Sequence, residues 1–187
     1  MERQVQEKDF NSYGARRGNH EVMMRGTFGN IRIRNEMAPG TEGGFTKLYP
    51  EGKVMPVYDA VTEYKKRGTD LVVIGGKEYG TGSSRDWAAK GTKLLGVKIV
   101  IAESFERIHR SNLIGMGILP LQFIDGMDRL SLKLTGSELL SVIDIEKGIL
   151  PLDKVEVEIK YISGDIKKIK TLCRIDTKNE LEYYKNG

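Results

Sequence analysis

Glycine, serine and arginine stand close together in one short segment, Lys77 to Ala89, which reads Lys-Glu-Tyr-Gly-Thr-Gly-Ser-Ser-Arg-Asp-Trp-Ala-Ala. Glycines let a backbone approach a bound group closely, and an arginine guanidinium is a planar fork that suits a carboxylate or a phosphate. A serine hydroxyl among such donors could act as a base or nucleophile, because the donors would stabilise its alkoxide. Ser83 and Arg85 are therefore the first candidate site residues.

The patterns on either side predict the elements that would position this segment. Leu71–Ile74 is a short β-branched run beside glycines, which is typical of a buried strand. Helical spacing follows over Trp87–Leu95, with a serine as N-cap and Asp86, three residues after Ser83, completing a capping box. Val97–Ile101 is the next predicted strand, so the segment joins a strand to a helix within a βαβ unit. The free N–H groups of such a helix start would favour an anion.

The same spacing also has a purely structural interpretation. A serine followed three residues later by an acidic residue is a common helix cap, and Arg85 would then be an exposed charge. Two nucleotide-binding motifs are excluded: no Gly-Lys precedes the serines, and Arg85 stands where the dinucleotide fingerprint needs its third glycine. Spacing alone therefore leaves a capped helix and a binding site both open.

The segment Tyr79–Gly91 resembles the active-site serine loop of the aconitase C-terminal domain, in the branch of the main bacterial enzyme and the animal iron-regulatory proteins. Further blocks resemble this family in the same order and cover nearly the whole chain: Asp9–His20, Arg25–Arg32, Ala102–Leu113, Gly115–Leu121, and Cys173–Thr177 with Glu180-Leu181. The resemblance implies an α/β fold, a swivelling β/β/α domain with a mixed sheet that is similar to the small subunit of isopropylmalate isomerase (LeuD-like).

The resemblance also implies a reaction and the residues that serve it. Aconitases interconvert citrate and isocitrate through cis-aconitate, by removing and re-adding water. Ser83 falls on the serine that takes the carbon-bound proton, and Ser84 and Arg85 fall on substrate-binding positions. Arg3 falls on a further carboxylate-binding arginine, although Gln4 stands where the family usually has glycine.

Four more residues are expected to support this loop. Gly80 and Gly82 would shape its backbone, and Asp86 would belong to the helix cap. His109 is the fourth, and we expect it to be a packed, hydrogen-bonding residue rather than a catalyst.

The number of cysteines limits which metal cofactor this chain can bind. The family's four-iron, four-sulfur cluster needs three thiolate ligands, and Cys173 is the one cysteine in the sequence. We expect no metal site here, and cluster-bearing domains absent from this chain. The family's C-terminal helix, which follows Tyr183-Tyr184, would be cut at Gly187. The chain alone is therefore expected to lack isomerase activity.

Composition predicts one cytoplasmic globular domain over residues 1–187. The 187 residues are 39% hydrophobic, and a lone cysteine fits a reducing compartment. No apolar run approaches the roughly 18 to 20 residues of a membrane span, and no signal sequence opens the chain. The net charge is +4, but the basic residues are scattered among 26 acidic ones, which is typical of solvated faces rather than of an RNA-binding surface.

The remaining segments predict further elements. Residues 1–20 are polar and indicate an arm or loop, and residues 125–187 are β-rich. The predicted strands and helices are a strand over Asn30–Arg34, a helix over Val57–Lys66, a helix opened by Glu103–Glu106, a strand over Leu119–Phe123 and a hairpin of Val155–Tyr161 with Ile166–Ile175. In the helix after residue 103, Ser104 is the expected cap and Phe105, Ile108 and Leu113 the buried face.

Two other functions stay open. The first is the separate small subunit of an isopropylmalate isomerase, which carries a similar Gly-Ser-Ser-Arg loop, although Tyr79–Gly91 and Asp9–His20 fit aconitase better. The second is an RNA-binding or regulatory module without catalysis, which a contiguous basic face would favour.

Overall fold

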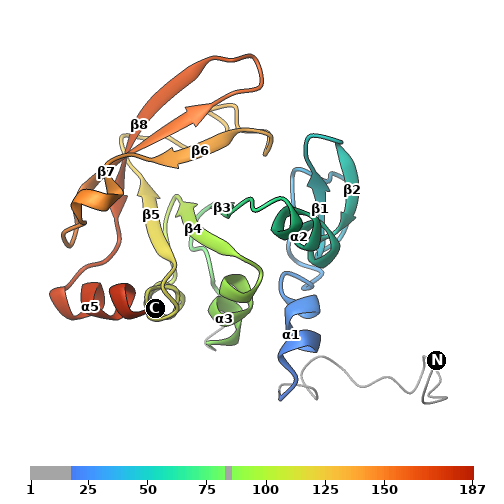
Figure 1. The fold of residues 1–187 in the computed structure, drawn as a ribbon, viewed down its shortest axis with the longest axis horizontal. Helices are drawn as coiled ribbons and strands as arrows, with labels where there is room; N and C mark the ends of the chain where they lie inside the picture. Colours follow the sequence, from blue (N-terminus) through green and yellow to red (C-terminus); the bar gives the residue numbers. More distant parts are fainter. Residues whose placement is uncertain (1–17, 83–85) are drawn as a thin grey trace.

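Helices and strands alternate as far as residue 123, and strands dominate from there to residue 173. The computed structural model describes residues 18–82 and 86–187 (Figure 1). The elements in chain order are α1 His20–Gly26, β1 Phe45–Leu48, β2 Lys53–Pro56, α2 Val57–Lys66, β3 Leu71–Gly75, α3 Trp87–Leu94, β4 Val97–Ala102, α4 Arg107–Gly115, β5 Leu119–Phe123, β6 Leu139–Val142, η3 Ile145–Lys147, β7 Lys154–Lys160, β8 Ile166–Cys173 and α5 Lys178–Asn186.

One six-stranded sheet organises the molecule. Its strand order is β3-β4-β5-β8-β7-β6, and the first three strands run parallel while β8, β7 and β6 join antiparallel. The parallel half is made by the βαβ units β3-α3-β4 and β4-α4-β5, of which the first was predicted as such. The predicted α/β class with a mixed sheet is confirmed.

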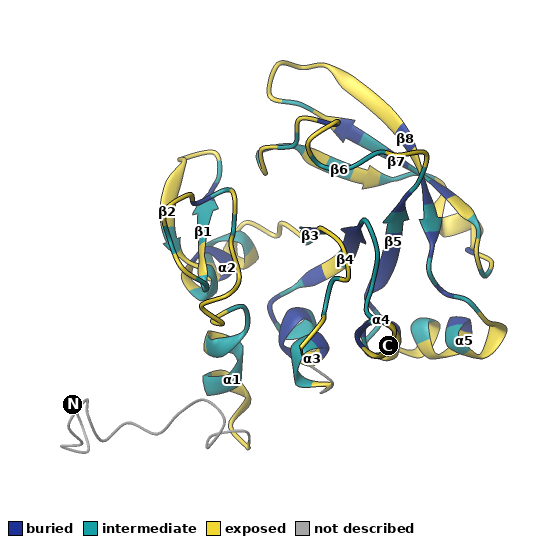
Figure 2. Ribbon diagram, turned by 180° about the vertical axis from the view of Figure 1, so that it is seen from behind, coloured by how far each residue is buried: buried dark blue, intermediate teal, exposed yellow. Residues whose placement is uncertain are grey.

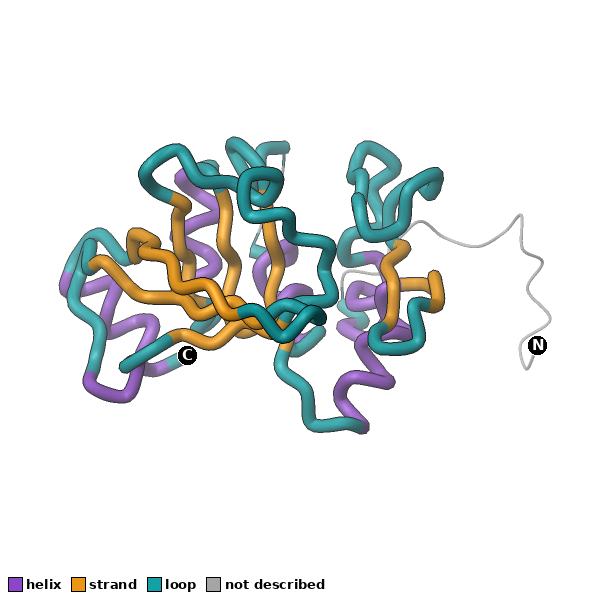
Figure 3. The backbone as a smooth tube through the Cα atoms, turned by 90° about the horizontal axis from the view of Figure 1, so that it is seen from above, coloured by secondary structure: helices purple, strands orange, loops and turns teal. Residues whose placement is uncertain are grey.

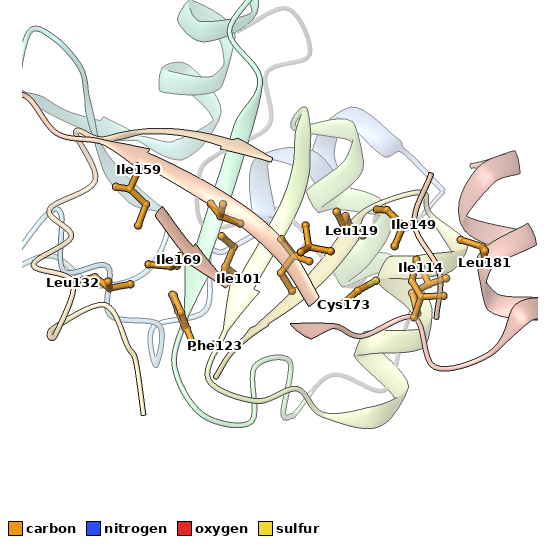
Figure 4. Close-up of a cluster of buried hydrophobic side chains, with 14 residues drawn as sticks. Ile101, Ile114, Leu119, Phe123, Leu132, Ile149, Ile159, Ile169, Cys173 and Leu181 are labelled. Atoms are coloured by element: carbon orange, nitrogen blue, oxygen red, sulfur yellow. The ribbon is translucent and has the colours of Figure 1, made fainter. Parts of the chain in front are cut away.

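The two faces of this sheet are covered differently. On β3 and β4, Leu71, Val73 and Val100 pack in a cluster with residues of α3 and α4, and these two helices contact each other. Ile99 and Ile101 face the opposite way, into a larger cluster that runs under β5, β7 and β8 (Figure 4). The alternation of side chains along a strand therefore splits one apolar run between two cores.

The segment from residue 18 to residue 68 lies beside the sheet and is not part of it. It contains α1, the β1–β2 hairpin and α2, which form a separate group in the view from above (Figure 3). The guanidinium of Arg25 lies 4.0 Å from the centre of the Tyr58 ring and links α1 to α2. Thr27 lies against Gly91 of α3, where a side chain in place of the glycine hydrogen would overlap it. This group thus rests on the helix that follows the serine segment.

The strand predicted over Asn30–Arg34 is wrong. Ile31 and Arg32 form a turn, because the Asn30 side chain accepts a hydrogen bond from the Arg32 N–H and the Asn30 carbonyl accepts one from the Ile33 N–H. This turn chemistry overrode the alternating pattern. α1 and the β1–β2 hairpin were not predicted. β3 was predicted as a buried strand, but it is the edge of the sheet with half-buried side chains.

The helix expected from residue 103 begins at Arg107, and its cap is Glu106 rather than Ser104. Residues 103–105 do not join the helix because they bond to the loop after β3, and backbone groups used in that way cannot also make helical bonds. Leu113 is buried as predicted, whereas Ile108 is 40% exposed, so its place in the buried face was wrong.

The C-terminal part confirms the predicted hairpin, in which β7 and β8 pair from Lys154↔Leu172 to Lys160↔Ile166. The exposed far end of this hairpin is visible in Figure 2. Cys173 is fully buried in the larger cluster. α5 then packs on α4, where the Arg110 guanidinium donates to both oxygens of Glu180 at 2.8 and 3.1 Å. In the described residues, no helix is both long and apolar enough to cross a membrane.

Candidate active-site loop

Two loops meet at the carboxyl ends of β3 and β4, the edge of a parallel sheet at which ligands commonly bind. The first is the start of the serine segment, residues 76–82, and the second is residues 103–106. They pair like strands, because the Tyr79 N–H donates to the Ser104 carbonyl at 2.9 Å and the Glu106 N–H donates to the Tyr79 carbonyl at 3.0 Å. The Glu78 N–H also donates to the Ser104 Oγ at 2.7 Å. The second loop therefore holds the first.

The Tyr79 ring packs between this pair of loops, the end of β3 and the start of α4. This ring meets Phe105 and His109 edge to face, with centroids 6.1 and 5.3 Å apart. A Cβ on Gly75 would lie 2.7 Å from the Tyr79 ring, so the last residue of β3 has to be glycine for this ring to lie where it does. Burial raises the pKa of the Tyr79 phenol, which therefore stays neutral.

Gly80 and Gly82 give the loop its path. Both have positive φ, +96° and +92°, where residues with a Cβ are strained. They differ in surroundings, since a Cβ on Gly80 would overlap the His109 ring whereas a Cβ on Gly82 would have no described atom within 4 Å. Gly80 is therefore needed for close packing as well as for its φ, and Gly82 for its φ alone.

His109 lies on the first turn of α4 and is 3% exposed. Its backbone N–H donates to the Glu106 Oε2 at 2.8 Å. Its ring packs against Tyr79 and Gly80, but its Nδ1 is buried with no hydrogen-bond partner among the described residues. Burial lowers the pKa of His109, and the negative charge of Glu106 opposes part of that effect. The sequence suggested a packed, hydrogen-bonding histidine, and the structure shows a packed ring with this nitrogen unpaired.

The other sequence-predicted site residues divide into two sets. Ser83, Ser84, Arg85 and Arg3 lie outside the described residues. Asp86 is described and is itself the N-cap of α3, with a helical backbone and no capping bond from its side chain. The helix thus begins at Trp87, and the prediction of a serine N-cap is wrong.

Sequence reasoning missed the residues that hold the loop. Ser104 was interpreted as a helix cap, and Glu106 and Tyr79 were given no role. The carboxylate of Glu106 accepts from the backbone three residues ahead, but glutamate is not one of the usual N-cap residues, so its type gave no capping signal. The bonds to residues 78 and 79 had no local signal, because they join positions about 26 residues apart in the chain.

The residues of this chain do not fit an iron–sulfur cluster. Within residues 18–82 and 86–187, no group of three or more histidine, cysteine, aspartate or glutamate side chains could hold a metal ion. The one cysteine of the sequence, Cys173, is buried in the core, and burial raises the pKa of its thiol, which disfavours the thiolate that iron requires.

A glycine-rich loop at the end of a parallel strand, paired with the next βα connection in a mixed sheet, defines an α/β domain with a candidate binding edge. The chain belongs to a particular family of this class, the aconitase C-terminal domain family, whose model matches residues 1–126.

Curated relatives agree with this family. Three proteins named aconitate hydratase A align with 98% of this chain. Those from Legionella pneumophila, Pseudomonas aeruginosa and Escherichia coli are 69%, 63% and 60% identical to this chain. Each alignment covers 20% of the relative, so the chain spans about a fifth of their length. A solved 3-isopropylmalate dehydratase (leuD) from Methanocaldococcus jannaschii aligns with 71% of this chain and 80% of its own at 25% identity, and the TM-score of 0.39 is too low to add to the fold.

Proposed function

We propose that this chain is the part of an aconitate hydratase that supplies the serine base and a substrate-carboxylate arginine for the interconversion of citrate and isocitrate through cis-aconitate. Membership in the aconitase C-terminal domain family, with 69% identity to a protein named aconitate hydratase A, carries this proposal. In it, Ser83 takes the carbon-bound proton, and Ser84, Arg85 and Arg3 bind the substrate.

The chemistry of the loop supports this assignment. A serine hydroxyl is a very weak acid, so it becomes a base only where cations and N–H donors stabilise its alkoxide. Arg85 is two residues from Ser83 in the sequence, and α3, whose first N–H groups have no acceptor within the helix itself, begins at Trp87. A substrate with three carboxylates also needs several positive groups, which fits arginines drawn from separate segments.

The same proposal makes this chain inactive by itself. Aconitase chemistry uses a four-iron, four-sulfur cluster, which the residues of this chain do not fit, and the relatives are about five times as long. We propose that the cluster and its ligands belong to other domains of the same enzyme, and that residues 1–187 act as one domain against them. A cytoplasmic location is part of this proposal.

Reconstitution tests this function. The chain would be mixed anaerobically with a separately produced cluster-bearing portion of a relative, and cis-aconitate would be followed by its absorbance as citrate is dehydrated. We expect activity with the wild-type chain, none with Ser83→Ala, and unchanged activity with Ser163→Ala, which alters a serine in the turn between β7 and β8.

Two results would contradict the proposal. Turnover of citrate by the purified chain alone would show that the cluster-bearing domains are not required. Absence of activity with every such partner, in chains shown to be folded, would leave the loop without a catalytic role and favour the two-subunit or RNA-binding alternatives.

A further inference from the structure

His109 carries a feature that packing alone does not explain. An apolar side chain of similar size would fill the space under the loop without burying a nitrogen, yet the Nδ1 of His109 is enclosed and unpaired among the described residues. Buried polar atoms of native proteins usually have a partner, so an exception calls for a reason. The question is what this ring does beside the loop that leads to Ser83.

The ring supports Gly80 directly. A Cβ at residue 80 would overlap the Cβ and the ring of His109, so this part of the loop backbone approaches the imidazole as closely as glycine permits. The preceding residue, Tyr79, is fixed by two backbone hydrogen bonds to residues 104 and 106, and its ring packs against the His109 imidazole. Residues 79 and 80 can therefore move little while the ring stays where it is.

We propose that His109 is a positioning residue for the serine loop: its neutral imidazole supports Gly80, and it fixes the point from which Gly82 and Ser83 follow. The proposal rests on the proposed function where it concerns Ser83, but the support of Gly80 is independent of it. His109 need not touch the substrate.

The charge state of the ring follows from its surroundings. A neutral imidazole can carry its proton on Nε2 and leave a lone pair on Nδ1, whereas an imidazolium has a second N–H that needs an acceptor. Among residues 18–82 and 86–187, the charged group that acts on His109 is Glu106, whose carboxylate already accepts from the backbone of residue 109. The other titratable neighbour, the Tyr79 phenol, stays neutral. Protonation would therefore place an unpaired charge under Gly80 and displace the loop.

The sign of the resulting pH dependence can be stated. Burial lowers the pKa of His109 below the ordinary value of about 6.5, so the supported loop is favoured at neutral pH. The support weakens as the pH falls below about 6.5 and is lost as the pH passes through the lowered pKa of His109.

Nuclear magnetic resonance on the 187-residue chain tests the proposal without any mutation. The sequence has two histidines, and His20 is exposed on α1, so it supplies an independent imidazole signal. Both rings and the amides of Tyr79, Gly80 and Gly82 would be followed from about pH 7.5 downward, across the ordinary histidine value. We expect the loop amides to shift with the midpoint of His109. Amides that follow His20, or that do not respond as His109 titrates, would overturn the proposal.

Variants separate charge from volume. His109→Gln keeps a neutral polar side chain that cannot be protonated, so we expect the loop amides to lose the pH dependence. His109→Ala removes the support and should move these amides at every pH, while His20→Gln should change nothing. If His109→Ala does not fold, the titrations of the wild-type chain and of His109→Gln still test whether His109 positions the loop. A loop that keeps the same pH dependence in His109→Gln would contradict the role of His109.

Activity then distinguishes this inference from the proposed function. In the reconstituted enzyme, Ser83→Ala should abolish turnover at all pH values. His109→Gln should leave kcat at neutral pH within about threefold and remove the loss of activity on the acid side that His109 protonation causes. If no partner gives activity, the proposed function fails, while the amide titration still tests the support of Gly80 by His109.

Discussion

The loop after β3 and the hairpin of β7 and β8 both make backbone hydrogen bonds to another segment, but different contacts stabilise them. The hairpin joins neighbouring segments through a regular ladder, and Val155, Val157 and Ile159 alternate into the larger core. The loop is held by bonds to residues 104 and 106 and by the ring of His109. The hairpin is therefore stabilised by apolar burial, and the loop by a few specific bonds and one close contact.

This difference separates stability from positioning. The larger core contains fourteen buried residues between Ile101 and Leu181, whereas the cluster beside the loop has five. Damage to the hairpin should lower the stability of the whole chain. Damage to the loop contacts should alter where a few residues lie, at a smaller expense of global stability.

The largest effect is expected in the hairpin. Ile159→Ala removes a side chain that is 1% exposed in the larger core, and we expect the free energy of unfolding to fall by about 4 kcal/mol in a denaturant titration. Ile166→Ala is the matched control on the neighbouring strand, where the isoleucine is 57% exposed, and it should change stability by less than about 0.5 kcal/mol. Similar losses for the two variants would show that the hairpin is not held by burial.

The next effect distinguishes the two glycines of the loop. Gly80→Ala adds a Cβ that overlaps His109 at a positive φ, and we expect a loss of about 3 kcal/mol in unfolding free energy. Gly82→Ala has nearly the same φ but no described neighbour within 4 Å, so about 1 kcal/mol is expected. Equal losses would mean that backbone conformation alone matters and that His109 does not limit the position of residue 80.

The same contrast explains how much could be predicted from the sequence. The hairpin was predicted because alternation along Val155–Tyr161 and the turn at Ser163–Asp165 are local signals. The first βαβ unit, β3-α3-β4, followed from apolar runs and their spacing. By contrast, residues 103–105 were predicted as the start of a helix, although they do not join it because they bond to a loop about 26 residues earlier in the chain.

The candidate site shows the same division. Gly80 and Gly82 were predicted from residue type, because positive φ is a property of glycine. The close contact of Gly80 with His109, and the anchoring by Ser104, arise only when β3 and β4 lie side by side. No local pattern contains that information, so the sequence named His109 as a supporting residue but could not show its contact with Gly80 or the anchoring by Ser104.

A third prediction concerns the ion pair that ties α5 to α4. The hydrogen bond from Arg110 lowers the pKa of Glu180, so the carboxylate stabilises the folded chain above the ordinary glutamate value of about 4.3, and this stabilisation is lost as the pH falls through the lowered pKa. We expect Glu180→Gln to lower the free energy of unfolding by about 2 kcal/mol at about pH 7. This value lies between those typical of exposed and of fully buried ion pairs, because both side chains are mostly buried. In paired denaturant titrations the difference from wild type should stay constant down to about pH 4.3 and shrink as the pH falls below that value.

Glu63→Gln is the control for that measurement, because Glu63 pairs with Lys66 at a similar distance, 2.7 Å, but on the exposed surface of α2. Its effect should be much smaller at every pH. A Glu180→Gln loss that did not change with pH would show that its carboxylate charge is not what holds α5 in place.

The smallest effect should be confined to the loop itself. Ser104→Ala removes the Oγ that accepts from the Glu78 N–H at 2.7 Å, and an amide that loses such a bond opens more easily by about 1 kcal/mol. Hydrogen exchange should therefore become faster at the Glu78 amide while the amides of β7 and β8 keep their rates. Ser111→Ala, which alters an exposed hydroxyl bonded within α4, should leave both unchanged. If Ser104→Ala instead accelerated exchange across the hairpin, the loop and the larger core would unfold together, and the separation of positioning from stability would be wrong.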